Sequence, residues 1–480
     1  VVDTMRRVVE VAEARIDQLE HPPTPPTELD EYPFRSAALA AGAWQIADGA
    51  RAKLVIVWSQ AGGMARYLCQ HDFRVPIVAC TSSAVAARRM ALYPGVRPLE
   101  MAVPGDANRQ AMLEQRLQVL GSASVRAGTL AKALQFPNLH RRLEREIATH
   151  QLDVVVSFME RANLLNLLGS RRRPRIISVR KQITVALADK SVFKRWLVAR
   201  AYPLLLRRAA AIVLNAHGSA ADFARRFAVA PNKLTVIPNS VAPEIATRAC
   251  ASPIGPGANH LGPETIVSVG RLLPAKGHAP LLRAFAHLRD SCPEARLVLV
   301  GDGPLRDTLR ELAAALGVAE QVAFPGFQEN PYPWMAGAGV VALPSRAEGF
   351  PNALLEAMYL GQACVAADCP TGPRELLAPD TPVDRIAAEV EITDAGVLVP
   401  PMPADDLDAA TPLTTGERAL AQALSRVLRE PELRSRLQAG AADRAAAFTP
   451  ARARAAWQAV IADSLRQAPG PPVRSVARLL

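Results

Sequence analysis

The sequence has few aromatic residues, no closely spaced cysteine pair and no long apolar run. Aromatic side chains make up 5% of the 480 residues, whereas half of all residues are hydrophobic. That hydrophobic content excludes an intrinsically disordered chain. No stretch reaches about 18 uninterrupted apolar residues, so a membrane-spanning helix is not expected. The first residues have a helix-like pattern without a charged and then apolar leader, which predicts no signal peptide.

The cysteines are too scattered to form a metal or disulfide framework. No two of the six make a CxxC pair. A zinc site or a disulfide framework is therefore not expected, and free thiols in a reducing cytoplasm are the simpler interpretation. The positions are Cys69, Cys80, Cys250, Cys292, Cys364 and Cys369.

Positive charge is concentrated in one part of the chain. The net charge is +11, but residues 126–235 alone hold 21 Lys and Arg against 6 Asp and Glu. The segment includes Arg171-Arg172-Arg173, Arg175, Arg180-Lys181, Lys194-Arg195 and Arg207-Arg208, with Phe193, Trp196 and Leu204 interspersed. Basic residues beside apolar ones suit an anionic lipid surface. A solvated, charged face is the alternative. Nucleic acid is a third candidate partner, but no nucleic-acid-binding motif supports it.

Two series of short Val/Ile/Leu-rich strands alternate with helices. The expected strands of the first series lie at 53–59, 75–81, 153–158, 175–180, 210–215 and 233–239. Those of the second lie at 265–270, 295–301, 321–326, 339–344, 363–368 and 396–400. Such runs predict parallel sheets buried on both faces. Residues 243–263 are rich in Pro, Gly, Ala and Ser and predict a crossing between domains, and 416–465 are expected to be helical.

The second series contains a cationic loop that suits a diphosphate. Gly270 and Arg271 close its first strand, and Lys276 follows five residues after the arginine. Ligands bind at the carboxyl ends of parallel strands, where Arg offers a planar fork and Lys a point charge. A solvated turn is equally compatible with these residues alone.

A second motif pairs two acids around a helix start. Glu348 and Glu356 are eight residues apart and are separated by the Gly349–Asn352 turn. Backbone N–H groups at a helix N-terminus are ready anion ligands. Glu348 could reach sugar hydroxyls and Glu356 ribose hydroxyls, although most glutamates are surface residues.

Together these strings resemble the donor domain of retaining glycosyltransferases of family 4, which have the GT-B fold. SVGRLLPAKG, VLVGDGPLRDTL, VAFPGF, PSRAEGFPNALLEAMYLGQACVAADCPTGPREL and GVLVP follow the family's order over 265–400, and 134–242 is similar to its N-terminal domain. The resemblance implies a hexosyltransferase that uses a UDP- or GDP-linked sugar, retains anomeric configuration and needs no metal or other cofactor. The form of the motif is similar to that of enzymes acting on lipid-linked or surface-polysaccharide acceptors, including lipopolysaccharide.

The same resemblance assigns residues. Arg271 and Lys276 hold the donor diphosphate, Glu348 orients the hexose and Glu356 the ribose. Glu160, Arg161 and Asn163 fall where acceptor contacts are expected, with a helix cap and surface charges as the alternative. The nucleotide pocket is expected to be shaped by Gly270, Gly301, Gly303, Gly326, Phe327, Gly349, Phe350, Pro351 and Asn352.

The start of the chain resembles a different family. The stretch AKLVIVWSQAGGMARYLCQHDFRVPIVACTSSAVAARRMALYPGVRPLEM is similar to the C-terminal domain of pyruvate kinase. No catalytic barrel accompanies it here, so phosphoenolpyruvate chemistry is not expected. Met64 and Ala61 replace hydroxyls of the effector turn, which argues against sugar-phosphate regulation. One hypothesis is that the Gly62-Gly63 turn replaces the glycine-rich loop of the glycosyltransferase; two simply joined domains are the alternative.

We therefore expect an α/β chain with four parts. They are a pyruvate-kinase-like domain (1–122), a shortened GT-B acceptor lobe (123–243), a donor domain (244–466) and a flexible tail (467–480). The expected protein is cytoplasmic, peripheral at the inner membrane face, and able to oligomerise through its first domain. The alternative is an inactive fusion that binds nucleotide-sugar or serves oligomerisation, or the remnant of a pyruvate kinase fusion.

Overall fold

A computed structural model of the chain describes residues 152–158, 160–169, 173–180, 183–184, 192–250, 255–403 and 407–467. It also describes short earlier pieces, at 55–58, 77–81, 87–88, 90–91, 96–100, 140–141, 143–145 and 147–149. Predictions for the helix at 1–20, the Gly62-Gly63 turn and the tail from residue 468 lie outside these residues.

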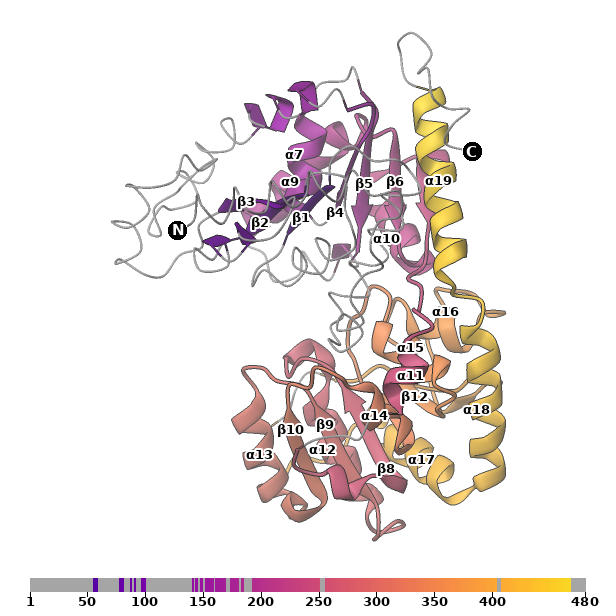
Figure 1. Cartoon of the computed structure of the whole chain (residues 1–480). Helices are drawn as coiled ribbons and strands as arrows, with labels where there is room; N and C mark the ends of the chain where they lie inside the picture. The colour runs from indigo at the N-terminus through magenta and orange to yellow at the C-terminus, as the bar shows by residue number, and fades with distance from the viewer. Residues whose placement is uncertain are drawn as a thin grey trace, which may run out of the picture.

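The acceptor lobe is built on a four-stranded parallel sheet in the order β4-β5-β6-β7 (Figure 1). The apolar runs predicted as strands form this sheet because their side chains are buried on both of its faces. Its strands are Val155–Phe158, Arg175–Val179, Ala211–Leu214 and Leu234–Val236. Its helices are α7 (Glu160–Leu168), α9 (Val192–Leu206) and α10 (His217–Phe227), followed by the short helix η2 (Pro231–Lys233).

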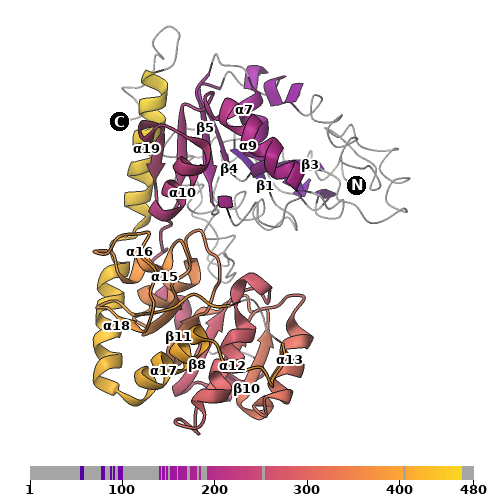
Figure 2. The same cartoon turned by 180° about the vertical axis from the view of Figure 1, so that it is seen from behind.

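The donor lobe is a seven-stranded sheet with helices on both faces (Figure 2). Its strands are β8 (Gly262–Val269), β9 (Arg296–Val300), β10 (Val322–Gly326), β11 (Ala338–Leu343), β12 (Cys364–Ala367), β13 (Glu391–Ile392) and β14 (Val397–Val399). Its α-helices are α11 (Ile245–Ala249), α12 (His278–Leu288), α13 (Arg306–Ala315), α14 (Tyr332–Ala336), α15 (Asn352–Tyr359), α16 (Pro373–Leu377), α17 (Thr415–Arg429) and α18 (Pro431–Ala445). Short helices η3 (Ala258–His260), η4 (Pro274–Lys276) and η5 (Ala319–Gln321) complete it.

The strand order of the donor sheet creates a crevice. The order β10-β9-β8-β11-β12-β14-β13 runs outward in both directions from β8 and β11, and the strands are parallel except β13. Connections from β8 and β11 therefore leave toward opposite sides. Ligands of such sheets bind at this point, beyond the carboxyl ends of the strands.

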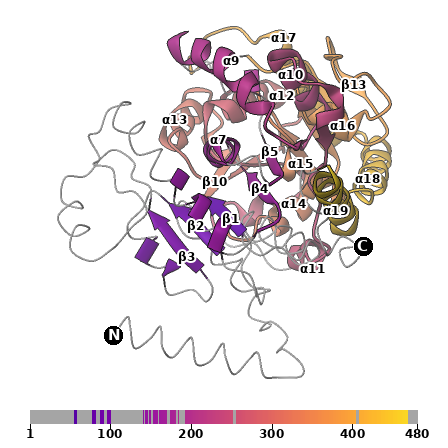
Figure 3. The same ribbon diagram turned by 90° about the horizontal axis from the view of Figure 1, so that it is seen from above.

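The first described strands form a separate parallel sheet beside the acceptor lobe. They are β1 (Val55–Trp58), β2 (Ile77–Thr81) and β3 (Val96–Glu100), in that order. β1 lies next to β4 (Figures 1 and 3). The pyruvate-kinase-like segment thus stands where the acceptor lobe lacks its opening strands. The third strand was not predicted, because Arg97 and Pro98 interrupt its apolar pattern.

The last helix corrects one predicted boundary. α19 (Pro450–Arg466) was counted with the donor domain, but it packs against the acceptor sheet (Figure 1). Trp457, Val460 and Ile461 share a buried cluster with Ile176 and Val213. The chain therefore crosses between lobes twice, and apolar burial attaches its last helix to the acceptor lobe.

Trp457→Ala should destabilise the acceptor lobe. The indole is 3% exposed, and its ring centroid is 5.5 Å from that of Phe158. Removing a buried Trp costs about 3–5 kcal/mol of unfolding free energy. Denaturant unfolding measures this loss, with the exposed Arg454→Ala on the same helix as a control expected to stay within about 0.5 kcal/mol of the parent. Parent-like unfolding of Trp457→Ala contradicts the packing of α19.

Candidate functional site

The two loops at the switch of strand order meet through an ion pair. Gly270 and Arg271 follow β8, and Lys276 ends the short helix η4. Glu348 lies in the loop after β11. Lys276 Nζ is 2.5 Å from Glu348 Oε1, and the two side chains are only 22% and 10% exposed. The structure thus brings together these four sequence-predicted residues at one edge of the sheet.

Arg271 supplies a free cation beside this pair. Its side chain is exposed and has no hydrogen-bond or ion-pair partner within the described part of the chain. Lys276, by contrast, is neutralised by Glu348. The donor loop therefore presents one uncompensated guanidinium and one ammonium that a carboxylate positions, an arrangement able to bind an anion through charge-assisted hydrogen bonds.

The predicted glycines bring backbone close to backbone at this edge. Gly301 follows β9 with φ +146°, and a Cβ there would lie 1.8 Å from the carbonyl oxygen of Gly270. Only glycine allows that approach. The Gly301 N–H donates to the carbonyl of Gly326 at the end of β10, and Gly303 lies against Leu272. Phe327, the next residue after β10, is 57% exposed.

The loop after β11 leads directly into α15. Pro351 precedes the first helical residue, Asn352, and no side chain caps the helix start. Phe350 is buried and packs against Phe448, with ring centroids 5.7 Å apart, so this residue offers its backbone rather than its ring. Glu356, one turn into the helix, is 7% exposed. The expected helix-terminal arrangement is therefore present.

Two titratable groups next to the ion pair are unsuited to proton transfer at neutral pH. Burial and the neighbouring Lys276 lower the pKa of His278 to about 3. Burial and the nearby Glu348 carboxylate raise the pKa of the Cys369 thiol to about 12. His278 is therefore neutral and Cys369 protonated, which leaves Glu348, Lys276 and Arg271 as the charged groups of the site.

The acceptor lobe contacts the donor loop through residues at the ends of its strands. The Arg180 carbonyl lies where a Cβ on Gly349 would be, 2.4 Å away, so this glycine is required for the approach. Asn239 Nδ2 donates to Asn352 Oδ1. Glu375 of α16 accepts from the backbone N–H groups of His217 and Gly218, at 2.6 and 2.9 Å.

Sequence reasoning did not assign these contacts. Arg180 is one of the basic residues of the segment 126–235, and no contact was predicted for Asn239. The available signal was position, because Arg180 directly follows β5 and Asn239 lies three residues after β7, at the carboxyl ends of parallel strands.

The acceptor-side prediction changes for Asn163. Its side chain is 1% exposed, accepts from Ser157 Oγ at 2.8 Å and donates to the Ser178 carbonyl at 2.8 Å. It ties β4 to β5 and has no path to a bound acceptor. Glu160 is exposed at the start of α7, and the side chain of Arg161 lies outside the described residues. Arg175, grouped with the basic surface, is buried and paired with Glu144 at 2.7 Å.

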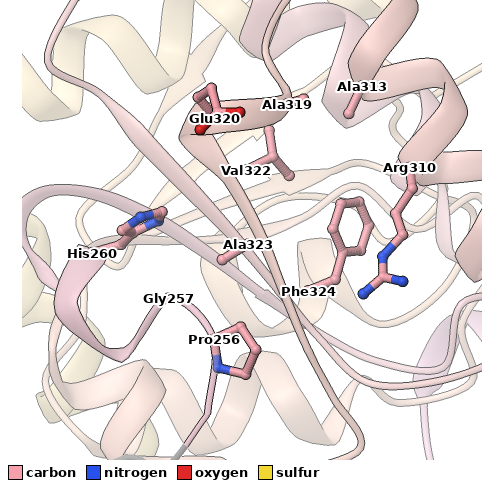
Figure 4. A pocket seen from close by; sticks show the side chains of 10 residues that line it. All are labelled: Pro256, Gly257, His260, Arg310, Ala313, Ala319, Glu320, Val322, Ala323 and Phe324. Carbon is pink, nitrogen blue, oxygen red and sulfur yellow. The ribbon is translucent and has the colours of Figure 1, made fainter.

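A pocket of about 410 Å³ lies away from this edge, at the beginning of β10 (Figure 4). Val322 and Phe324 line it, and the Arg310 guanidinium lies 5.6 Å from the Phe324 ring centroid. The predicted nucleotide residues Gly326 and Phe327 are at the other end of the strand. This pocket is therefore separate from the switch-point site.

Comparisons with known proteins agree with this architecture. The family model described as glycosyl transferases group 1 matches residues 256–410, and that described as pyruvate kinase, alpha/beta domain, matches 37–133. The structure resembles Anabaena HepE in complex with UDP and glucose, with a TM-score of 0.57, 18% identity, and coverage of 84% of this chain and 97% of that one. It also resembles a Rickettsia africae glycosyltransferase, with a TM-score of 0.59, 12% identity, and coverage of 87% and 99%.

Sequence relatives are similar over part of their length. One is the Campylobacter jejuni N-acetylgalactosamine-N,N'-diacetylbacillosaminyl-diphospho-undecaprenol 4-alpha-N-acetylgalactosaminyltransferase, 30% identical over 257 residues, which are 52% of this chain and 67% of that protein. Another is the Mycolicibacterium smegmatis GDP-mannose-dependent alpha-(1-6)-phosphatidylinositol monomannoside mannosyltransferase, 36% identical over 143 residues, covering 28% and 36%.

The fold and the paired lobes define a GT-B protein preceded by a pyruvate-kinase-like α/β segment. The chain belongs to the group 1 glycosyltransferases. The predicted resemblances to a GT-B glycosyltransferase and to the pyruvate kinase domain are thereby confirmed.

His278 should make the donor lobe acid-sensitive. The pKa of His278 is about 3 in the folded protein, below its ordinary value of 6.5. Below pH 6.5 the unfolded chain therefore binds a proton at this residue that the folded protein does not bind. Between pH 7 and pH 5 this linkage removes about 2 kcal/mol of stability. Denaturant unfolding at both pH values should show a smaller acid loss for His278→Asn. Identical losses in parent and variant contradict the buried neutral imidazole.

Proposed function

We propose that the chain is a retaining, metal-independent glycosyltransferase of family 4 that uses a nucleotide-diphosphate hexose. The observation that supports this most is the meeting of Arg271, Lys276 and Glu348 at the switch of strand order. A diphosphate placed there pairs with the two cations and accepts hydrogen bonds from the N–H groups at the start of α15, while Glu348 lies beside the sugar. The exposed ring of Phe327 offers an aromatic surface at the end of β10.

The proposed reaction is a front-face substitution at the anomeric carbon. The bond from that carbon to the diphosphate oxygen breaks, and a bond to the acceptor oxygen forms on the same face. The acceptor hydroxyl proton passes to the departing diphosphate. Arg271 and Lys276 stabilise the charge that develops on the leaving group, a form of electrostatic catalysis. Glu348 holds Lys276 in position and orients the hexose hydroxyls.

The acceptor is proposed to be lipid-linked or a surface polysaccharide. The C. jejuni relative acts on a diphospho-undecaprenol and the mycobacterial one on a phosphatidylinositol mannoside, according to their names. Donor base and sugar are open between UDP and GDP forms, as HepE binds UDP and the mycobacterial relative is GDP-mannose-dependent.

Substituting the site should abolish transfer without unfolding the chain. Arg271→Gln removes the free cation, and Glu348→Gln releases Lys276, so we expect turnover of the accepted donor to fall at least about 100-fold in each, the loss expected for one transition-state donor. Donor hydrolysis and transfer are measured across UDP- and GDP-sugars. Arg436→Gln and Glu294→Gln, exposed on the same lobe, serve as charge-matched controls. A parent that binds nucleotide but turns over no donor supports a binding module instead.

A peripheral membrane surface is proposed on α9. Leu204 is 59% exposed, and the exposed Arg200 and Arg207 lie four residues before and three after it, so the three share one helix face. An apolar side chain between cations suits an anionic bilayer. No helix within the described residues is long and apolar enough to cross a membrane.

Neutralising that face should weaken binding to anionic vesicles. The variant Arg200→Gln/Leu204→Ser/Arg207→Gln loses two cations, each worth about 1 kcal/mol near an anionic surface, and one apolar anchor. Co-sedimentation with phosphatidylglycerol vesicles should drop by at least about tenfold. Arg429→Gln/Arg436→Gln removes equal charge from the donor lobe as a control. Equal binding of the parent to neutral and anionic vesicles rules the surface out.

A further inference from the structure

Arg180 is a cation without a counter-ion at the junction of the lobes. It directly follows β5, and its Nη2 donates to Asn239 Oδ1. The side chain is partly exposed, no carboxylate among the described residues pairs with it, and Asn239 is its one side-chain partner there. Other arginines of the acceptor lobe are satisfied differently. Arg175 pairs with Glu144, and Arg208 donates to the carbonyls that end α7.

Arg180 is a partly exposed cation that has lost part of its hydration. This loss lowers the pKa of its guanidinium to about 10, so it remains charged at neutral pH. An anion stabilises a partly dehydrated cation by replacing the lost hydration. The carboxamide oxygen of Asn239 is one neutral acceptor, and the remaining guanidinium donors are open to solvent and to a ligand.

The surroundings of Arg180 belong to the proposed donor site. Its carbonyl lies against Gly349, one residue after Glu348. Its partner Asn239 also donates to Asn352, the first residue of α15. The guanidinium therefore approaches the donor loop from the opposite lobe. Glu348 neutralises Lys276, and among the described residues near this loop Arg271, Arg346 and Arg180 have no ion-pair partner. Of these three, Arg180 comes from the acceptor lobe.

We propose that Arg180 binds a phosphate group of a substrate at the junction of the two lobes. The inference rests on the proposed glycosyl transfer and adds an acceptor-lobe ligand to it. A phosphate oxygen accepts the free guanidinium donors and supplies the missing negative charge. Two sources have this chemistry: the diphosphate of the nucleotide-sugar and a diphosphate that carries the acceptor. Binding of either would draw Arg180 and the donor loop to a common anion.

Calorimetric titration of the full chain separates the two sources. UDP and GDP are titrated first, and inorganic pyrophosphate is then titrated into protein saturated with the nucleotide that binds. A hydrogen bond to a charged group is worth about 1.5–3 kcal/mol, so Arg180→Gln should weaken one of the two titrations by at least about tenfold. A loss for the nucleotide assigns Arg180 to the donor, and a loss for pyrophosphate alone assigns it to the acceptor.

Matched variants distinguish binding from a structural role. Asn239→Ala removes the bond between the lobes but keeps the charge, and it should retain most of the affinity. Arg180→Lys keeps the charge without the fork and should fall between parent and Arg180→Gln. Arg225→Gln, exposed on α10, controls for net charge. Parent-like affinities in Arg180→Gln, or equal losses in Arg180→Gln and Asn239→Ala, overturn the proposal.

The proposed function and this inference can fail separately. If the parent binds pyrophosphate but no nucleotide, the donor assignment falls, and Arg180→Gln still tests the anion site through pyrophosphate. If the parent binds neither probe, both proposals fall. Should Arg180→Gln not fold, judged by its thermal unfolding, Arg180→Lys carries the comparison.

Discussion

The reversal of strand order between β8 and β11 is the constraint on which the site depends. Because the two strands are parallel neighbours, their carboxyl ends lie at one edge while their connections diverge. The crevice this leaves brings Lys276 and Glu348, 72 residues apart in the chain, to 2.5 Å. The close approach of Gly301 to Gly270 tightens the same edge. The positions of the charged groups thus follow from topology before any side-chain detail.

Polar contacts and a small apolar contact connect the acceptor lobe to the donor loop, since Ala216 and Val241 share a buried cluster with Phe350. The Glu375 carboxylate accepts hydrogen bonds from the backbone N–H groups at the start of α10, where the helix dipole favours a negative charge. Asn239 joins Asn352. Each contact is directional, so together they fix how the lobes face each other without filling the space a substrate needs. α19 adds a larger apolar attachment, because it packs against β5 and β6 in the middle of the acceptor sheet.

The sequence was informative where burial and topology coincide. The twelve predicted strands appear because runs such as those of β9 and β12 are buried on both faces, and the loops after β8 and β11 follow from the strand order. Tertiary packing decided the rest. The side chain of Asn163 is buried and hydrogen-bonded within the acceptor lobe, and Arg175 forms an ion pair with Glu144, 31 residues away in the sequence. β3 pairs with the edge of β2 although it contains Arg97 and Pro98. Residue type alone does not show that Arg175 is a buried structural residue whereas Arg180 lies at the junction of the lobes.

The position of the pyruvate-kinase-like segment suggests how two families share one lobe. The likeness to HepE covers 84% of the chain, more than the part that follows residue 139, so it takes in some of the earlier segment. In that segment β1–β3 are parallel, and β1 lies beside β4. Parallel sheets are held by backbone hydrogen bonds and by apolar faces that make few demands on exact sequence. A strand–helix unit from one family can therefore stand beside a sheet of another. What such an exchange does not carry over is the chemistry of the strand-end loops, and the proposed phosphate ligand Arg180 accordingly follows β5, a strand of the acceptor sheet itself.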